Sequence, residues 1–266
     1  GCIDLAAFPA LAGDHSCSPR DLLDSVLGEE WVLDVARVCS RLEAKLAKAR
    51  TGADRVNATR GSDLELERVD KEYSSRAGAN NAHFLLTREE SDPSAYIRAT
   101  FRPGAELNAI GIWGFSHLVA LRLAGRLQEP GLAEAERADL ALRALAVEWY
   151  GIHFLQDAFA SGHVAGTWGD TALRKGTHDY YNVHGLGTAT WKGKAVVLTG
   201  DTWMRPQDRD LAAPVARRSL EQLLDALDPA SPLARSVATV EIPDPVLTSG
   251  IETCRASTLP PLGGSA

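Results

Sequence analysis

Two long segments rich in alanine and leucine, residues 104–127 and 132–163, most limit what this chain can fold into. Each carries apolar side chains on too many sides for a helix that lies on the surface of a globular protein. Such helices have to be buried by the rest of the chain. The two segments therefore predict a pair of central helices.

Helical spacing also dominates the residues before them. Residues 18–46 begin with a Ser-Pro cap signal and keep apolar residues three and four apart, which predicts a helix with a break at Gly28. Residues 62–89 begin with Ser62 three residues before a glutamate, the spacing of a capping box. Residues 78–81 interrupt the helical pattern there, so we expect two helical pieces with an irregular joint.

The last third of the chain changes character twice. Alternating residues around Lys192–Gly193 predict a small β-hairpin, and helical spacing returns in residues 206–227. Six of the thirteen prolines fall in residues 229–266, which predicts an extended, irregular tail. The sequence thus predicts an all-α, compact multi-helix fold in residues 1–228, with the tail packed on the same domain.

The amino-acid composition limits which binding partners and which cellular compartment can be expected for this protein. The net charge of −7 lacks the basic footprint of a nucleic-acid-binding protein, so nucleic acid is an improbable partner. No apolar run is long enough to span a bilayer and no signal peptide is recognisable at Gly1, so we expect no transmembrane segment and a chain that is either cytosolic or already processed. Four separated cysteines fit two disulfides in a secreted or periplasmic protein, or else buried free thiols: Cys2, Cys17, Cys39 and Cys254.

The stretch "HFLQDAFASGH", residues 153–163, has the spacing of a metal site. His153 and Asp157 are four residues apart, hence on one face of a helix, and Ala160 leaves room there for an ion and a water. His163 is six residues beyond Asp157 and rotates off that face unless the helix ends. The spacing therefore suggests two neighbouring ions. The alternative is a core histidine bonded to a backbone carbonyl, with Asp157 paired to an arginine.

The motifs "HFLQD" and "ASGH" resemble those of the superfamily that joins bacterial zinc-dependent phospholipases C to zinc-dependent single-strand nucleases. "AGDHSCSP", "RAGANNAHFL" and "HDYYNVHGL" are similar to the bacterial branch that contains phosphatidylcholine-cleaving phospholipases C. The order and spacing of the family's site residues recur to within one residue at His15, Asp70, His83, His153, Asp157, His163 and His178. The resemblance covers residues 10–190 and implies an all-helical fold that holds two or three zinc ions.

The chain departs from this family at two ligand positions. Where the family has a carboxylate four residues after the last histidine, this chain has Asn182, so either its amide oxygen or Asp179 would bind the ion. The family's amino-terminal tryptophan, whose amine and carbonyl hold a zinc, is absent. Unless Gly1 is the mature terminus and reaches the site, Asp14 is the available replacement.

The resemblance also implies roles. Asp70 would be the general base or a bridging ligand, and the joint at residues 78–81 would let it face the same site as His83. His117 is expected to be a buried histidine oriented by the backbone, and His184 ranks below His178 as a ligand. Tyr180 and Tyr181 are candidates for the rim of the site.

The function expected from these features is that of a phospholipase C, in which water activated by zinc attacks the phosphodiester of a phosphatidylcholine-like lipid at a membrane surface. A single-strand nuclease would use the same metal core, but it would need stacking aromatics and positive charge near the cleft. A metal-stabilised, non-catalytic binding domain is the third alternative. Manganese or iron could also occupy a site of histidines and carboxylates.

Overall fold

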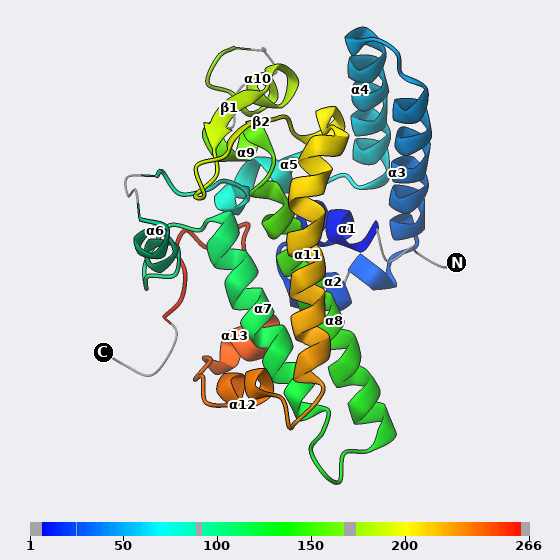
Figure 1. Ribbon diagram of the computed structural model, residues 1–266. Coiled ribbons are helices and arrows are strands. Elements are labelled where there is room, and N and C mark those ends of the chain that lie inside the picture. Colours follow the sequence, from blue (N-terminus) through cyan, green and yellow to red (C-terminus); the bar gives the residue numbers. More distant parts are fainter. Residues whose placement is uncertain (1–6, 25, 89–91, 168–173, 262–266) are drawn as a thin grey trace.

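Two central helices, α7 (Ala109–Arg126) and α8 (Glu134–Asp157), form the centre of the computed structural model, which describes residues 7–24, 26–88, 92–167 and 174–261. They lie side by side and pack against each other along their length (Figure 1). Phe115, Tyr150 and Phe154 are fully buried between the elements around them. The predicted pair of central helices is confirmed, and the fold is all-α as expected.

Helix α11 (Pro206–Ala226) packs across this pair. A buried polar network joins the three helices: His117 of α7 contacts Glu148 of α8 at 2.8 Å, and Ser219 of α11 donates to Glu148 at 2.6 Å. Trp113 donates to Ser219 at 3.0 Å. His117 is buried as predicted, but a carboxylate rather than the backbone orients it. Burying Glu148 is tolerable because each of its oxygens has a partner.

The amino-terminal helices cover one side of α8. The helix expected over residues 18–46 is broken near Gly28, as predicted, and the elements in this region are α1 (Phe8–Asp14), α2 (Pro19–Asp24), the 3-10 turn η2 (Val26–Gly28) and α3 (Trp31–Lys48). Helix α4 (Gly52–Val69) folds back along α3, and the two form a helical hairpin at the edge of the molecule (Figure 1).

The capping box predicted at Ser62 was wrong. Helix α4 begins ten residues earlier, where Thr51 accepts a hydrogen bond from the Asp54 N–H and the Asp54 side chain accepts one from Thr51 N–H. Ser62 lies inside the helix and is buried. The first ten residues of α4 have little apolar periodicity, so their helical state depends on this cap and on packing against α3.

The joint predicted at residues 78–81 is confirmed, but the helical pieces on its two sides differ from the prediction: a second break falls at residues 70–72, and only a 3-10 turn follows the joint. Helix α4 ends at Val69, and the elements that follow it are α5 (Tyr73–Ala79), the 3-10 turn η3 (Asn81–His83) and α6 (Pro93–Thr100). Asn80 forms the turn, because its side chain accepts a hydrogen bond from the Ala82 N–H at 3.1 Å. Asp70 and His83 are therefore on separate elements.

Short elements follow α8 where the central helix ends. They are α9 (Ser161–Ala165), α10 (His178–His184), the strands β1 (Leu186–Ala189) and β2 (Ala195–Leu198), and the 3-10 turn η4 (Asp201–Trp203). The strands pair antiparallel with Leu186 opposite Leu198 and Ala189 opposite Ala195. This confirms the predicted hairpin, whose turn contains Gly193 with a φ of 77°.

The proline-rich tail packs on the helical body and is not wholly extended. It contains α12 (Pro232–Ala238) and α13 (Asp244–Ser249), and a disulfide joins Cys254 to Cys17. Cys39 carries a free thiol, so the expectation of two disulfides among the four cysteines was wrong. Cys2 lies outside the described residues. Within the described part of the chain, no helix is long and apolar enough to cross a membrane.

Candidate metal centre

The candidate metal centre lies where α8 ends and five other elements meet it. Asp157 is the last residue of α8, and the chain then turns so that His163 belongs to α9. The end of α8 removes the rotational conflict between Asp157 and His163 that a continuous helix would impose. The remaining side chains come from α1, η3, α10 and η4.

Three groups of imidazole and carboxylate ligand atoms converge here, and within each group the atoms lie within 4.8 Å of one another. The groups are Asp14, His83 and His153; His83, Asp157 and His163; and His163, His178 and Asp201. The middle group shares His83 with the first group and His163 with the third. The first and third groups share no residue, so together they can hold two ions without dividing a ligand.

Asp157 lies between these two separate groups. Its Oδ2 is 2.8 Å from Nδ1 of His83 and 3.4 Å from Nε2 of His153, whereas its Oδ1 is 3.3 Å from Nδ1 of His163. Burial raises the pKa of this carboxyl, but the attraction of His153, His163 and His83 outweighs it and holds the pKa well below its usual range. Asp157 is thus a carboxylate with one oxygen toward each group, which is the geometry of a bridging ligand.

Pairs of imidazole nitrogens face each other within both separate groups. His153 Nε2 is 3.1 Å from His83 Nδ1, and His178 Nε2 is 3.1 Å from His163 Nε2. Histidine nitrogens and carboxylate oxygens in groups of three or four are the ligand set of zinc. The residues present therefore fit zinc, and two sites of three ligands each leave positions open for water or substrate.

Asp201 supplies the carboxylate of the third group, a role that the sequence prediction had given to Asn182 or Asp179. Its Oδ2 is 3.2 Å from Nε2 of His178. Among the described residues, Asp201 is the only non-glycine residue with positive φ, at 49°. Aspartate tolerates this left-handed region better than most residues, and such conformations concentrate at functional sites.

Asn182 contacts this group through its amide nitrogen, and its amide oxygen accepts a backbone hydrogen bond. The Gly162 backbone N–H donates to Asn182 Oδ1 at 2.7 Å, which identifies that atom as the amide oxygen because a backbone N–H can only donate. The Asn182 amide nitrogen then donates to Asp201 Oδ2 at 2.6 Å. Asp179 is outside the group as well, since its Oδ1 lies 2.8 Å from the far nitrogen of His178, Nδ1.

The charges around His178 favour a cation at this position. Burial lowers the pKa of His178, but Asp179 and Asp201 outweigh it and raise the pKa to about 10. The carboxylates that favour a proton on the imidazole also favour a metal ion beside it, since both are positive charges. A metal ion would have to displace that proton to bind.

His15 and Asp70 form a buried pair outside the three groups. His15 Nδ1 is 2.7 Å from Asp70 Oδ2, and Arg76 donates to the same oxygen at 2.5 Å. Burial raises the pKa of Asp70, but the hydrogen bonds with His15 and Arg76 outweigh it and lower the pKa. The pair adjoins the metal groups through Asp14, the neighbour of His15. Their predicted ligation has no support from these contacts.

Two glycines permit the close packing of ligands. A Cβ added at Gly13 would lie 2.0 Å from the ring of His153, and one added at Gly200 would lie 2.0 Å from Asn182 Oδ1. Both distances are far below van der Waals contact, so only glycine fits unless these side chains move. The backbone of α1 is thereby held against the ring of His153, and the residue before Asp201 is held against Asn182.

A further carboxyl group stands at the edge of this cluster. Partial burial, followed by repulsion from Asp179, Asp201, Glu67 and Asp14, raises the pKa of Asp63 on α4 to about 6. The sequence analysis did not select Asp63, which resembles a surface residue of a helix. Only the folding of α4 against this region brings it near the other carboxylates.

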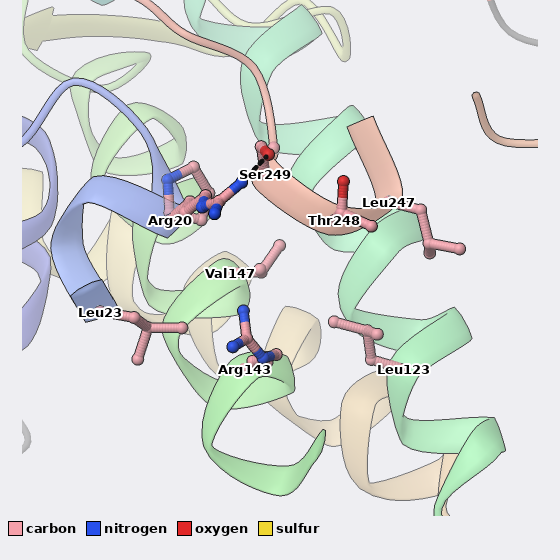
Figure 2. A pocket seen from close by; sticks show the side chains of 10 residues that line it. Arg20, Leu23, Leu123, Arg143, Val147, Leu247, Thr248 and Ser249 are labelled. Atoms are coloured by element: carbon pink, nitrogen blue, oxygen red, sulfur yellow. Dashed lines mark hydrogen bonds between the residues drawn. The ribbon is translucent and has the colours of Figure 1, made fainter. Parts of the chain in front are cut away.

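His184 and Tyr180 lie beside each other at 4.5 Å between ring centroids, and neither belongs to the three groups. A cavity elsewhere, between α2, α8 and α13, has a volume of only about 10 Å³ (Figure 2). That is room for about one water. Its two arginines are already neutralised, Arg20 by Asp24 and Arg143 by Asp139. It offers no competing ligand site.

Comparison of the chain with protein-family models, with curated proteins and with solved structures gives no match. The described geometry alone therefore supports the assignment of the site.

Proposed function

We propose that this protein is a zinc-dependent phosphodiesterase of the phospholipase C type, acting on phosphatidylcholine-like glycerophospholipids. The observation that carries the proposal is the placement of two separate three-residue ligand groups on opposite oxygens of buried Asp157. Two-metal sites of this kind are suited to hydrolysis of phosphate esters. The motif resemblance directs the proposal to lipid.

The residues on each side of Asp157 would hold one ion each. Asp14, His83 and His153 form one site, and His163, His178 and Asp201 form the other, with Asn182 and Asp179 fixing the orientation of the second. When bound, zinc lowers the pKa of a coordinated water and neutralises charge on the phosphoryl oxygens. Asp157 keeps the two sites adjacent.

The motif resemblance gives the acceptance of the water proton to Asp70. Both oxygens of Asp70 already accept hydrogen bonds, from His15, Arg76 and the Glu72 N–H, and its pKa is lowered, so it is a weak base. Asp70 instead fixes His15 beside Asp14.

The test measures metal content and turnover together. Zinc in the purified protein should be close to two ions per chain, and phosphocholine release from phosphatidylcholine vesicles should stop with chelator and return with zinc. Asp157→Ala should lose both zinc and turnover. His184→Ala is the matched control, because this histidine is near the site but outside the three groups, and it should keep both.

Other outcomes would redirect the proposal. Chelator-sensitive cleavage of single-stranded DNA without phosphocholine release would indicate the nuclease alternative. Bound zinc with no turnover on either substrate would indicate a metal-stabilised binding domain. We also propose that the protein works in an oxidising compartment, secreted or periplasmic, because the Cys17–Cys254 disulfide is typical of such proteins.

A further inference from the structure

The β-hairpin carries an exposed aromatic and basic tip next to the candidate site. Strand β1 follows α10, which provides His178, with only Gly185 between them. Trp191 stands in the turn and is 39% exposed, and Lys192 and Lys194 beside it are exposed. Strands advance about 3.3 Å per residue, so the tip lies on the order of 13 Å beyond the end of α10. Figure 1 shows the hairpin at the periphery, beside α10 and above α6.

The indole of Trp191 is held in place but not covered. The Arg88 guanidinium lies 3.6 Å from the centre of its ring, and Tyr96 of α6 contacts it at 5.6 Å between centroids. Tyr96 is itself fixed by donating to the Leu86 carbonyl at 3.1 Å. An ordered, amphipathic ring that remains open to solvent is the kind of side chain found at membrane–water interfaces.

The hairpin itself is positively charged. Residues 185–200 contain two lysines and no acidic residue, although the whole chain has a net charge of −7. Within the described part of the chain, no ion pair neutralises Arg88, Lys192 or Lys194. Lys192 and Lys194 therefore place two positive charges at the tip of a hairpin that has no acidic residue of its own.

We propose that this hairpin tip, Trp191 with Lys192, Lys194 and Arg88, docks the protein on the surface of an anionic phospholipid bilayer. The indole would enter the interface while the lysine stems lie along it with their ammonium groups at the lipid phosphates. Each lysine or arginine near such a surface strengthens binding several-fold. The inference rests on the proposed function, since a lipid substrate requires the metal centre to meet a bilayer.

The first experiment measures binding without turnover. The purified, zinc-loaded protein is sedimented with vesicles of phosphatidylcholine alone or mixed with phosphatidylglycerol. We expect binding to the mixed vesicles that weakens with salt. Trp191→Ala and the double change Lys192→Glu with Lys194→Glu should each lower binding by about tenfold or more. The double change Lys45→Glu with Lys48→Glu on α3 alters the net charge equally and should bind as the unchanged protein does.

The second experiment separates docking from the proposed function. Hydrolysis of a soluble short-chain phosphatidylcholine should be the same in the hairpin variants and in the unchanged protein, whereas hydrolysis of mixed vesicles should fall with their binding. Equal vesicle binding by the hairpin variants and the unchanged protein overturns the docking proposal. So does a result in which the hairpin variants lose only binding to single-stranded DNA. Hairpin-dependent vesicle binding with no hydrolysis of either lipid would support docking and contradict the proposed function.

Discussion

The Asn182 amide nitrogen donates to the Asp201 carboxylate at 2.6 Å, while the amide oxygen is held by the Gly162 N–H at 2.7 Å. An amide thus occupies the place where a carboxylate ligand was expected, and it aims a carboxylate from another element at the site. Asp201 comes from beyond the hairpin, 19 residues further along the chain.

The first prediction concerns the hydrogen bond between Asn182 and Asp201. Asp201→Ala should remove one zinc per chain, because it deletes a ligand of the third group. Asn182→Ala should keep the ligand but weaken zinc affinity by roughly 10–100-fold, the usual effect of losing a partner that orients a ligand. Competition with a zinc chelator measures both. Asp179→Asn should have a smaller effect, and equal zinc content in Asp201→Ala and the unchanged protein would contradict the assignment.

The second prediction separates a bridging residue from a ligand of one site. Asp157→Asn weakens a contact to both groups and should lower the affinity for both ions, whereas His178→Ala should affect one. Zinc titration of the metal-free protein should therefore show two weakened sites in the first variant and one in the second. A single weakened site in Asp157→Asn would mean that this residue serves one group only.

The third prediction is a pH dependence away from the site. Burial raises the pKa of Asp208, but Arg205 and Thr199 outweigh it and lower the pKa from 3.8 to about 2. A lowered folded-state pKa stabilises the protein above pH 3.8, and this stabilisation is lost as pH falls toward 2. Asp208→Asn should cost about 2 kcal/mol of unfolding free energy at neutral pH.

Chemical denaturation of both proteins at neutral pH and at successively lower pH tests this linkage. The stability difference between the unchanged protein and Asp208→Asn should be constant near neutral pH and shrink below about pH 4. Asp210→Asn is a control, because that residue is exposed on the same helix. A difference that stays constant down to pH 3 would mean that Asp208 acts through its shape and not its charge.

The fourth prediction tests the network between the central helices. Glu148→Ala should destabilise the fold by about 3–5 kcal/mol, because it leaves His117 and Ser219 without their partner in a buried position. Glu129→Ala, at an exposed ion pair, should change stability by less than about 1 kcal/mol. Thermal or urea unfolding gives both values. An equally small loss of stability in both variants would show that water takes the place of the Glu148 carboxylate.

Sequence patterns predicted those parts of the site that depend on local spacing. His153 and Asp157 are one turn apart on a helix, and the joint before His83 was visible as a run of glycine and asparagine. Asp14 and Asp201 belong to the groups because elements distant in the sequence pack together. A short-range sequence pattern does not reveal such packing. The ligand role of Asn182 stays a prediction for a related reason, since an amide at a ligand position can bind an ion or hold its neighbour, and here its nitrogen contacts Asp201.

The same distinction between local signals and long-range packing applies to the fold. Apolar helices and the hairpin turn have strong local signals, whereas the polar beginning of α4 becomes helical through its cap and its contact with α3. The pairing of Cys17 with Cys254 could not be derived from four scattered cysteines, because the residues meet only after the tail has crossed the helical body.

That crossing ties the chain around Asp14 to a segment far along the sequence. Cys17 is two residues from His15 and three from Asp14, and its partner lies 237 residues later, so a segment far along the chain fastens the first part of the centre. Thr253, next to the disulfide, also donates its N–H to the Cys17 carbonyl at 2.7 Å. If Asp14 binds an ion as proposed, ion binding there is therefore expected to weaken when this disulfide is reduced.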